Sequence, residues 1–183
     1  MTIPRIIVLV GLMGTGKSTI ARGLAQHFAA DVLDTDKLVE QRANQSVRSI
    51  FARRGEDAFR DLESEVLGEC LRTPGPAIVA GAGGVVLRAA NREALNEARR
   101  SGAATVVWLH ARPEVLVART AKGAHRPLLD DDREGTLRRM ADERAPLYSE
   151  VADMVVDVSE RSAESVTSLI IDALTVAESE SAG

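Results

Sequence analysis

The sequence predicts a three-layer α/β/α fold in which helices cover both faces of a five-stranded parallel β-sheet. Short apolar runs alternate with longer helical stretches along the 183 residues, a pattern typical of parallel sheets. Hydrophobic residues make up 45% of the chain but aromatic residues only 3%, which suits buried aliphatic strands. Glycine-rich or charged clusters follow several predicted strands, at the edge where such folds bind ligands.

The first half of the chain begins with a buried strand and a helix. Residues 5–10 are predicted to form a strand, apolar from Ile6, that enters a glycine-rich loop. The helix over residues 18–29 has one apolar face, because Ile20, Leu24 and Phe28 recur at fourfold spacing.

The next elements surround two clusters of unusual composition. A short strand at 32–33 leads into an acidic turn, and helical sequence follows over 37–42 and 47–72, with Gly55 interrupting the longer segment. The apolar run 77–80 then enters a second glycine-rich turn.

Prolines mark helix boundaries in the second half. Pro113 begins a helix, since the first turn tolerates proline, and Pro146 predicts a break near the end of another. The predicted elements are, in order, helix 92–101, strand 104–109, the helix from Pro113, helix 134–148, strand 154–158 and a helix ending near Leu174.

The chain predicts a single domain over residues 1–175, a length sufficient for one core. The polar, irregular stretch at about 121–133 predicts a mobile lid. Residues 176–183 are small and acidic, so we expect a disordered tail.

Charge and cysteine content exclude several classes of protein. A formal net charge of −4 is unsuited to nucleic-acid binding, which requires a basic surface. The apolar run 6–13 is too short to cross a membrane. Cys70 is the only cysteine and cannot form an intramolecular disulfide, which fits a reducing compartment. We therefore expect a cytoplasmic monomer without nucleic-acid or membrane partners.

The glycine-rich loop at residues 11–18 carries the most specific motif. Its sequence GLMGTGKS matches the G-x-x-x-x-G-K-[ST] pattern, between a predicted strand and a predicted helix. Backbone N–H groups of such a loop point at phosphate oxygens, the lysine approaches the β- and γ-phosphates, and the hydroxyl is a Mg²⁺ ligand. The expected ATP-binding residues here are Gly14, Thr15, Gly16, Lys17, Ser18 and Thr19.

The loop alone indicates a nucleotide but not a reaction. The sequence contains no Asn-Lys-x-Asp stretch of the kind that guanine-binding switches carry. The chain is also short for a mechanical ATPase. Both observations favour a small-molecule kinase.

Several further motifs follow in a specific order. Together with the phosphate loop they resemble the shikimate kinase family over about residues 6–174. The matching pieces are Asp34-Thr35-Asp36, Ile50-Phe51, Gly55-Glu56, Phe59-Arg60, Glu63, the second glycine-rich turn, Arg126-Pro127-Leu128-Leu129 and Arg144-Ala145-Pro146-Leu147-Tyr148.

The resemblance implies a P-loop nucleoside-kinase-like fold with a mobile lid. It also implies transfer of a phosphoryl group from ATP, with Mg²⁺, to the 3-hydroxyl of shikimate in aromatic amino acid (chorismate) biosynthesis. ATP and shikimate are the expected partners. Kinases of other hydroxylated metabolites, such as gluconate or a nucleoside monophosphate, are alternatives, as is an ATP-binding module without turnover.

Two acids at the end of the second predicted strand are candidates for metal and acceptor contacts. We expect Asp34 to face the Mg²⁺ site together with Ser18. Asp36 is expected to orient the acceptor hydroxyl and to accept its proton late in the transfer. The alternative is that both acids only cap the following helix, since aspartate is a good N-cap.

Arg60 and Arg144 are the expected clamp for the acceptor carboxylate, because a guanidinium grips a carboxylate through two parallel hydrogen bonds. Glu63 lies three residues beyond Arg60, on the same helical face. It either holds Arg60 or contacts an acceptor hydroxyl. The alternative is an ordinary surface ion pair of little energetic value.

Three more arginines are expected near the nucleotide. Arg126, in the predicted lid, would stabilise the charge of the transferring phosphoryl group, and it joins Lys17 and Asp36 as a predicted catalytic residue. By resemblance, Arg119 and Arg161 match positions that contact the adenine end.

The second glycine-rich turn departs from the family pattern. Related sequences have three consecutive glycines here, which fall on Ala82, Gly83 and Gly84 when counted back from Asn91-Arg92. A count from the strand would shift the match by one residue, to Gly81, and in either register Ala82 replaces one glycine. The backbone N–H groups of Gly83 and Gly84 are expected to meet the acceptor. The methyl group of Ala82 is harmless if its φ is negative. A positive φ would strain the turn by about 1 kcal/mol or change which acceptor fits.

Overall fold

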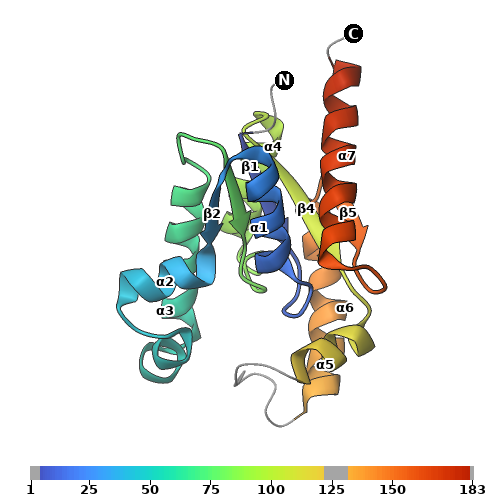
Figure 1. Cartoon of the computed structure of the whole chain (residues 1–183). Coiled ribbons are helices and arrows are strands. Elements are labelled where there is room, and N and C mark those ends of the chain that lie inside the picture. The colour runs from blue at the N-terminus through green and yellow to red at the C-terminus, as the bar shows by residue number, and fades with distance from the viewer. Residues whose placement is uncertain (1–4, 122–131, 182–183) are drawn as a thin grey trace.

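A computed structural model describes residues 5–121 and 132–181 and confirms the predicted fold class (Figure 1). Five parallel strands form one sheet in the order β2-β3-β1-β4-β5. The strands are β1 (Ile6–Val10), β2 (Asp31–Asp34), β3 (Ala77–Ala80), β4 (Ala104–His110) and β5 (Met154–Asp157). The helices are α1 (Lys17–Phe28), α2 (Thr35–Ala43), α3 (Val47–Cys70), α4 (Ala89–Arg100), α5 (Pro113–Ala121), α6 (Arg133–Val151) and α7 (Ala163–Ser181).

Strand β1 lies at the centre of the sheet, and all five of its residues are buried. It pairs with β3 on one side and with β4 on the other, so that Leu9 lies opposite both Ala80 and Val107. Burial on both faces explains why the strand is a continuous apolar run rather than an alternating one. The phosphate loop therefore leaves the sheet from the middle of its carboxyl edge.

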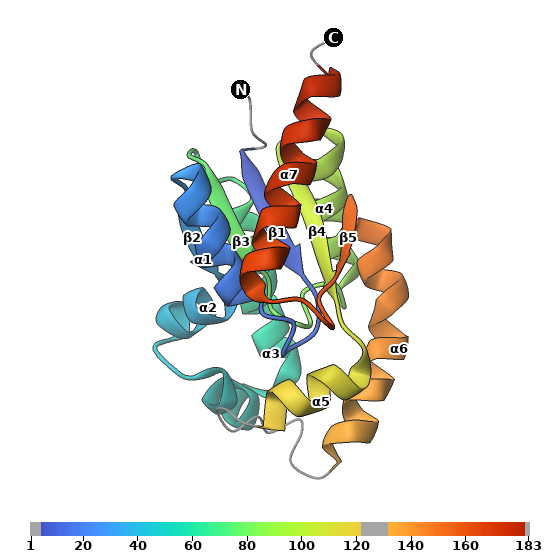
Figure 2. The same cartoon turned by 45° about the vertical axis from the view of Figure 1, so that its right-hand side comes forward.

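Helices cover both faces of the sheet (Figures 1 and 2). Helices α1 and α7 pack together on one face, and α4 and α6 pack on the other. The buried stripe of α1 consists of Ile20, Ala21, Leu24 and Ala25. Tyr148 of α6 is buried on the opposite face, which completes the three layers.

Two helices differ from the sequence prediction. Helix α6 continues through Pro146 to Val151, although an interior proline removes one backbone hydrogen bond. Arg144, Tyr148 and Val151 are buried on either side of the proline, so tertiary packing outweighs the missing bond. Helix α7 runs on through Ser181, including residues 176–181 for which a tail was expected, because no glycine or proline interrupts the segment.

The interruption predicted in the long helical segment is present. Gly55 has φ 81° and ψ 174° inside α3, so the helix kinks there. The proposed lid lies largely outside the described residues, and so does Arg126.

The two edges of the sheet have different surroundings. The beginning of β1 and the end of α7 lie at the edge opposite the phosphate loop (Figure 1). Helices α2 and α5 and the first part of α3 lie beyond the carboxyl edge, whereas the second part of α3 runs alongside the sheet. Within the described ranges, no helix has the combination of length and apolarity that crossing a membrane requires.

Candidate active site

The phosphate loop has a backbone that only glycine adopts readily. Gly11, Gly14 and Gly16 have φ values of 142°, 87° and 90°, which L side chains disfavour. A side chain at Gly11 would also collide with the carbonyl oxygen of Leu109. Gly16 precedes α1 without a side-chain cap, so the amino end of the helix is suited to an anion.

The side chain of Lys17 reaches back across the phosphate loop. Its Nζ donates to the carbonyl oxygens of Gly11 at 2.8 Å and Leu12 at 2.9 Å. These bonds hold the ammonium group across the loop, where a polyphosphate would lie.

Ser18 and Asp34 form a pair of oxygen groups beside the loop. The Ser18 hydroxyl donates to Oδ2 of Asp34 at 2.9 Å. The other carboxylate oxygen of Asp34 accepts from the backbone N–H of Lys37 at 3.4 Å, so Asp34 also caps α2. Within the described residues no cluster of three acidic, histidine or cysteine ligands is found. The pair nevertheless fits Mg²⁺, which is usually held by one or two protein oxygens, substrate phosphates and water.

Asp36 lies in the first turn of α2 and lines the same cavity as Lys17. Its side chain keeps access to solvent, yet protein surrounds it on most sides. This burial, together with the Asp34 carboxylate, raises the pKa of Asp36, and Lys17 offsets the rise only in part.

One cavity of about 990 Å³ joins these groups. Its size is at the upper end of the range for small-molecule sites. The lining residues come from the phosphate loop, α2, the first part of α3, the second glycine-rich turn and α5. Of the predicted site residues they include Gly14, Gly16, Lys17, Ser18, Thr19, Asp34, Asp36, Gly83 and Arg119.

Arg60 and Glu63 form a buried ion pair on α3. Nη1 of Arg60 donates to both carboxylate oxygens of Glu63, at 3.0 and 2.9 Å, and the side chains are only 9% and 0% exposed. Burial works against the charge of Arg60, but Glu63 and Glu56 outweigh it and raise the pKa of the guanidinium. The pair is therefore not the surface ion pair considered as the alternative.

Side chains from α3 and α6 both contact the second glycine-rich turn. Arg144 donates from Nη1 to the carbonyl oxygen of Gly83 at 2.9 Å, and the hydroxyl of Tyr148 donates to the same oxygen at 2.5 Å. A Cβ on Gly84 would overlap the Arg60 guanidinium, 2.6 Å from its Cζ. The two arginines thus meet on neighbouring residues of one turn. Gly83 lines the cavity, whereas Arg60, Glu63, Gly84 and Arg144 are not among its lining residues.

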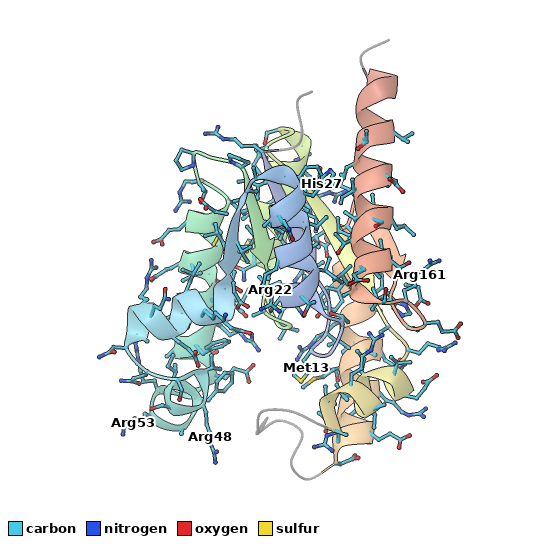
Figure 3. All side chains as sticks on the ribbon, viewed as in Figure 1. Met13, Arg22, His27, Arg48, Arg53 and Arg161 are labelled. Atoms are coloured by element: carbon cyan, nitrogen blue, oxygen red, sulfur yellow. The ribbon has the colours of Figure 1, made fainter. Side chains whose placement is uncertain are left out.

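The remaining predicted arginines are placed differently. Arg119 lines the cavity and donates from Nη2 to the carbonyl oxygen of Val158 at 2.8 Å. Arg161 is exposed in the loop between β5 and α7 (Figure 3), and it is not part of the cavity wall. Thr15 is buried and donates its hydroxyl to the carbonyl oxygen of Leu12 at 2.8 Å, so it shapes the loop from behind.

The sequence model of shikimate kinases matches residues 13–175. The chain belongs to the shikimate kinase family. It is 42% identical to the shikimate kinase of Pseudomonas putida over 171 residues, which cover 93% of this chain and 96% of that protein. Family membership makes it a small-molecule kinase.

Solved structures agree with this assignment. The shikimate kinase of Acinetobacter baumannii, solved in complex with shikimate, superposes with a TM-score of 0.88 at 33% identity, covering 96% of this chain and 94% of that one. A gluconokinase of Sinorhizobium meliloti has a TM-score of 0.62 at 17% identity, with 96% and 94% covered. The second likeness shows the fold alone.

Ala82 does not strain the second glycine-rich turn. Ala29 and Asn44 are the described non-glycine residues with positive φ, so φ of Ala82 is negative. Its N–H donates to the Thr35 hydroxyl at 2.8 Å, and its side chain is buried. The negative φ means that the methyl group of Ala82 is harmless, which was the first of the two alternatives for this departure from the family pattern.

Several cavity residues were not predicted from the sequence as site residues. Met13, Arg48 and Phe51 line the cavity, and Figure 3 shows Met13 on the phosphate loop and Arg48 at the start of α3. Tyr148 was quoted only as part of a motif. Its position in Arg-Ala-Pro-Leu-Tyr, one helical turn after Arg144, was a signal that both side chains meet the same turn.

Proposed function

We propose that this protein transfers the γ-phosphoryl group of ATP to the 3-hydroxyl of shikimate, a step of aromatic amino acid biosynthesis. One observation carries the proposal beyond family membership. The phosphate loop and Asp36 face a single cavity, and Arg60 and Arg144 meet on the turn that forms its wall. This arrangement suits an acceptor with both a hydroxyl and a carboxylate.

The phosphate loop would hold ATP through its backbone N–H groups and Lys17. Ser18 and Asp34 are the proposed holders of Mg²⁺, which when bound neutralises phosphate charge. Arg119, on the cavity wall, supports the nucleotide. Arg161 is proposed for the adenine end as well, by family resemblance alone.

Asp36 would orient the acceptor hydroxyl and take its proton as the phosphoryl group transfers. Its raised pKa makes it a better proton acceptor than an ordinary aspartate. Lys17 and Arg126 would balance the charge that develops between donor and acceptor. The proposed role of Arg126 rests on its place in the Arg-Pro-Leu-Leu motif.

The backbone N–H groups of Gly83 and Gly84 and the guanidiniums of Arg60 and Arg144 are proposed to bind the acceptor. Nε of Arg144 is buried without a hydrogen-bond partner among the described residues, so this donor is suited to the acceptor carboxylate. Glu63 would hold Arg60 in position. We place the enzyme in the cytoplasm, consistent with its single, buried cysteine, and propose that it is a monomer.

The test is ADP release by the purified protein with ATP, Mg²⁺ and one acceptor at a time. Shikimate should give turnover, and ³¹P NMR of the product should show the phosphate on the 3-hydroxyl. Gluconate and nucleoside monophosphates serve as comparison acceptors. ATP binding without shikimate-dependent ADP release would reject the proposal. Faster turnover with gluconate than with shikimate would identify gluconate as the preferred acceptor.

A further inference from the structure

Glu56 lies at the kink of α3 and reaches back to Arg60. It follows Gly55, whose positive φ starts the second part of the helix, and it lies four residues before Arg60 on the same helical face. The Glu56 side chain is 61% exposed, whereas that of Arg60 is 9% exposed. An exposed carboxylate thus covers a buried guanidinium.

The Glu56 carboxylate occupies the Nε and Nη2 edge of the Arg60 guanidinium, which is also suited to the carboxylate of a ligand. Oε1 of Glu56 accepts from Nη2 at 3.0 Å and from Nε at 3.3 Å. Through such an edge a guanidinium can donate two parallel hydrogen bonds to one carboxylate. Nη1 is already bonded to Glu63, and Gly84 packs against the group, so the edge held by Glu56 is the one from which a partner can leave.

The two glutamates differ in how easily they can leave. Glu63 is 0% exposed, and separating it from Arg60 would leave a buried charge without a partner. Glu56 is mostly in solvent, where an ion pair contributes little and the released carboxylate is rehydrated. Replacement of Glu56 by another carboxylate leaves the charge of Arg60 balanced.

We propose that Glu56 competes with the acceptor for Arg60. Its carboxylate holds the Nε and Nη2 edge until the carboxylate of the acceptor takes its place. This inference rests on the proposed function, because it requires an acceptor that carries a carboxylate. Glu56 then sets the KM for that acceptor and keeps Arg60 oriented when no acceptor is bound.

The test compares Glu56→Gln with Asp57→Asn. Asp57 is the next residue, is exposed and is not a partner of Arg60, so its variant controls for loss of one negative charge near an anionic acceptor. Glu56→Gln should lower the KM for shikimate by about two- to fivefold, the equivalent of an exposed ion pair. The kcat and the KM for ATP should stay within about twofold of the parent protein.

A second acceptor separates competition from a general effect. The methyl ester of shikimate lacks the charged carboxylate, so its kcat/KM should not improve in Glu56→Gln. An unchanged or higher KM for shikimate in Glu56→Gln, or an equal fall in Asp57→Asn, would overturn the inference. The parent protein is measured first, because absence of its shikimate-dependent turnover is a failure of the proposed function and not of the role of Glu56. Thermal denaturation of each variant verifies folding.

Discussion

Asp36 lies where three carboxylates approach one another. Burial raises its pKa, and the charges of Asp34 and Glu40 raise it further, against the opposing effects of Lys17 and Arg60. A carboxyl group whose pKa is raised by folding binds its proton more tightly in the folded state. Its contribution to stability therefore falls as the pH rises from the ordinary carboxyl pKa through the raised one. Above the raised pKa, the ionised Asp36 carboxylate weakens the fold.

Asp36→Asn should therefore separate stability from catalysis. We expect kcat to fall by about 10²–10⁴, as for loss of a general base, with little change in ATP affinity. The melting temperature at pH 7 should rise, because the variant removes a disfavoured charge. In the parent protein the acid limb of kcat should lie above the pKa of an ordinary aspartate, about 3.9. Near-normal turnover in steady-state kinetics would remove Asp36 from the mechanism.

Ala82 and Gly84 occupy the same turn under different constraints, which gives a matched pair of substitutions. Gly84→Ala would push the new methyl into the Arg60 guanidinium, so we expect kcat/KM for shikimate to fall at least about tenfold, the loss of one charged contact. Ala82→Gly restores the family pattern at a position with negative φ. It should leave kcat/KM within about twofold and cost at most about 1 kcal/mol of stability. An improved kcat/KM in Ala82→Gly would show that the methyl restricts the acceptor.

Among the elements, those with local signals were predictable. The apolar run of β1, the fourfold spacing in α1 and the Gly55 interruption each specify backbone conformation within a few residues. The end of α6 was not predictable from the sequence. Whether the helix continues beyond Pro146 depends on the burial of Tyr148 and Val151, which is a matter of tertiary packing. The long-range contacts of Arg60 and Arg144 with Gly83 and Gly84 were accessible only through the family resemblance.

The kink of α3 can be tested with two glycines in open surroundings. A Cβ on Gly55 or on Gly75 would meet no atom within 4 Å, so neither substitution adds a clash. Gly55 has φ 81°, whereas Gly75 lacks a positive φ. Gly55→Ala should therefore lower the free energy of unfolding by about 1–2 kcal/mol, or the melting temperature by about 2–8 °C.

Gly75→Ala is the control, and it should be neutral or stabilising by up to about 1 kcal/mol. Chemical denaturation of both variants measures the difference. Equal stabilities for Gly55→Ala and Gly75→Ala would mean that the kink relaxes without cost.

For the whole molecule, the sheet order places every site segment on one edge. Because β1 is central, the phosphate loop has the acidic turn and the second glycine-rich turn on one side and α5 on the other. The alternation of strands and helices predicted this common edge. It did not predict the volume of the cavity or the contact between Glu56 and Arg60, which depend on side-chain packing.

A cavity shared by the two substrates predicts stabilisation by ligands. ATP with Mg²⁺ at about 100 times its Kd should raise the free energy of unfolding by about 2.7 kcal/mol, which corresponds to about 5–11 °C in melting temperature. Lys17→Ala should remove most of this shift, because the ammonium group is held across the phosphate loop.

Lys37→Ala is the charge-matched control, since Lys37 is exposed and lies outside the cavity wall. Thermal denaturation with and without ATP measures both variants. A full shift in Lys17→Ala would contradict the assignment of the loop.

The placement of the first strand and the last helix has a practical consequence. Both the start of β1 and the end of α7 point away from the phosphate loop (Figure 1). A sensor chip, bead or fusion partner attached through either end would therefore leave the mouth of the cavity facing free solution. Surface-coupled protein should bind nucleotide as tightly as protein in solution, whichever end is tethered.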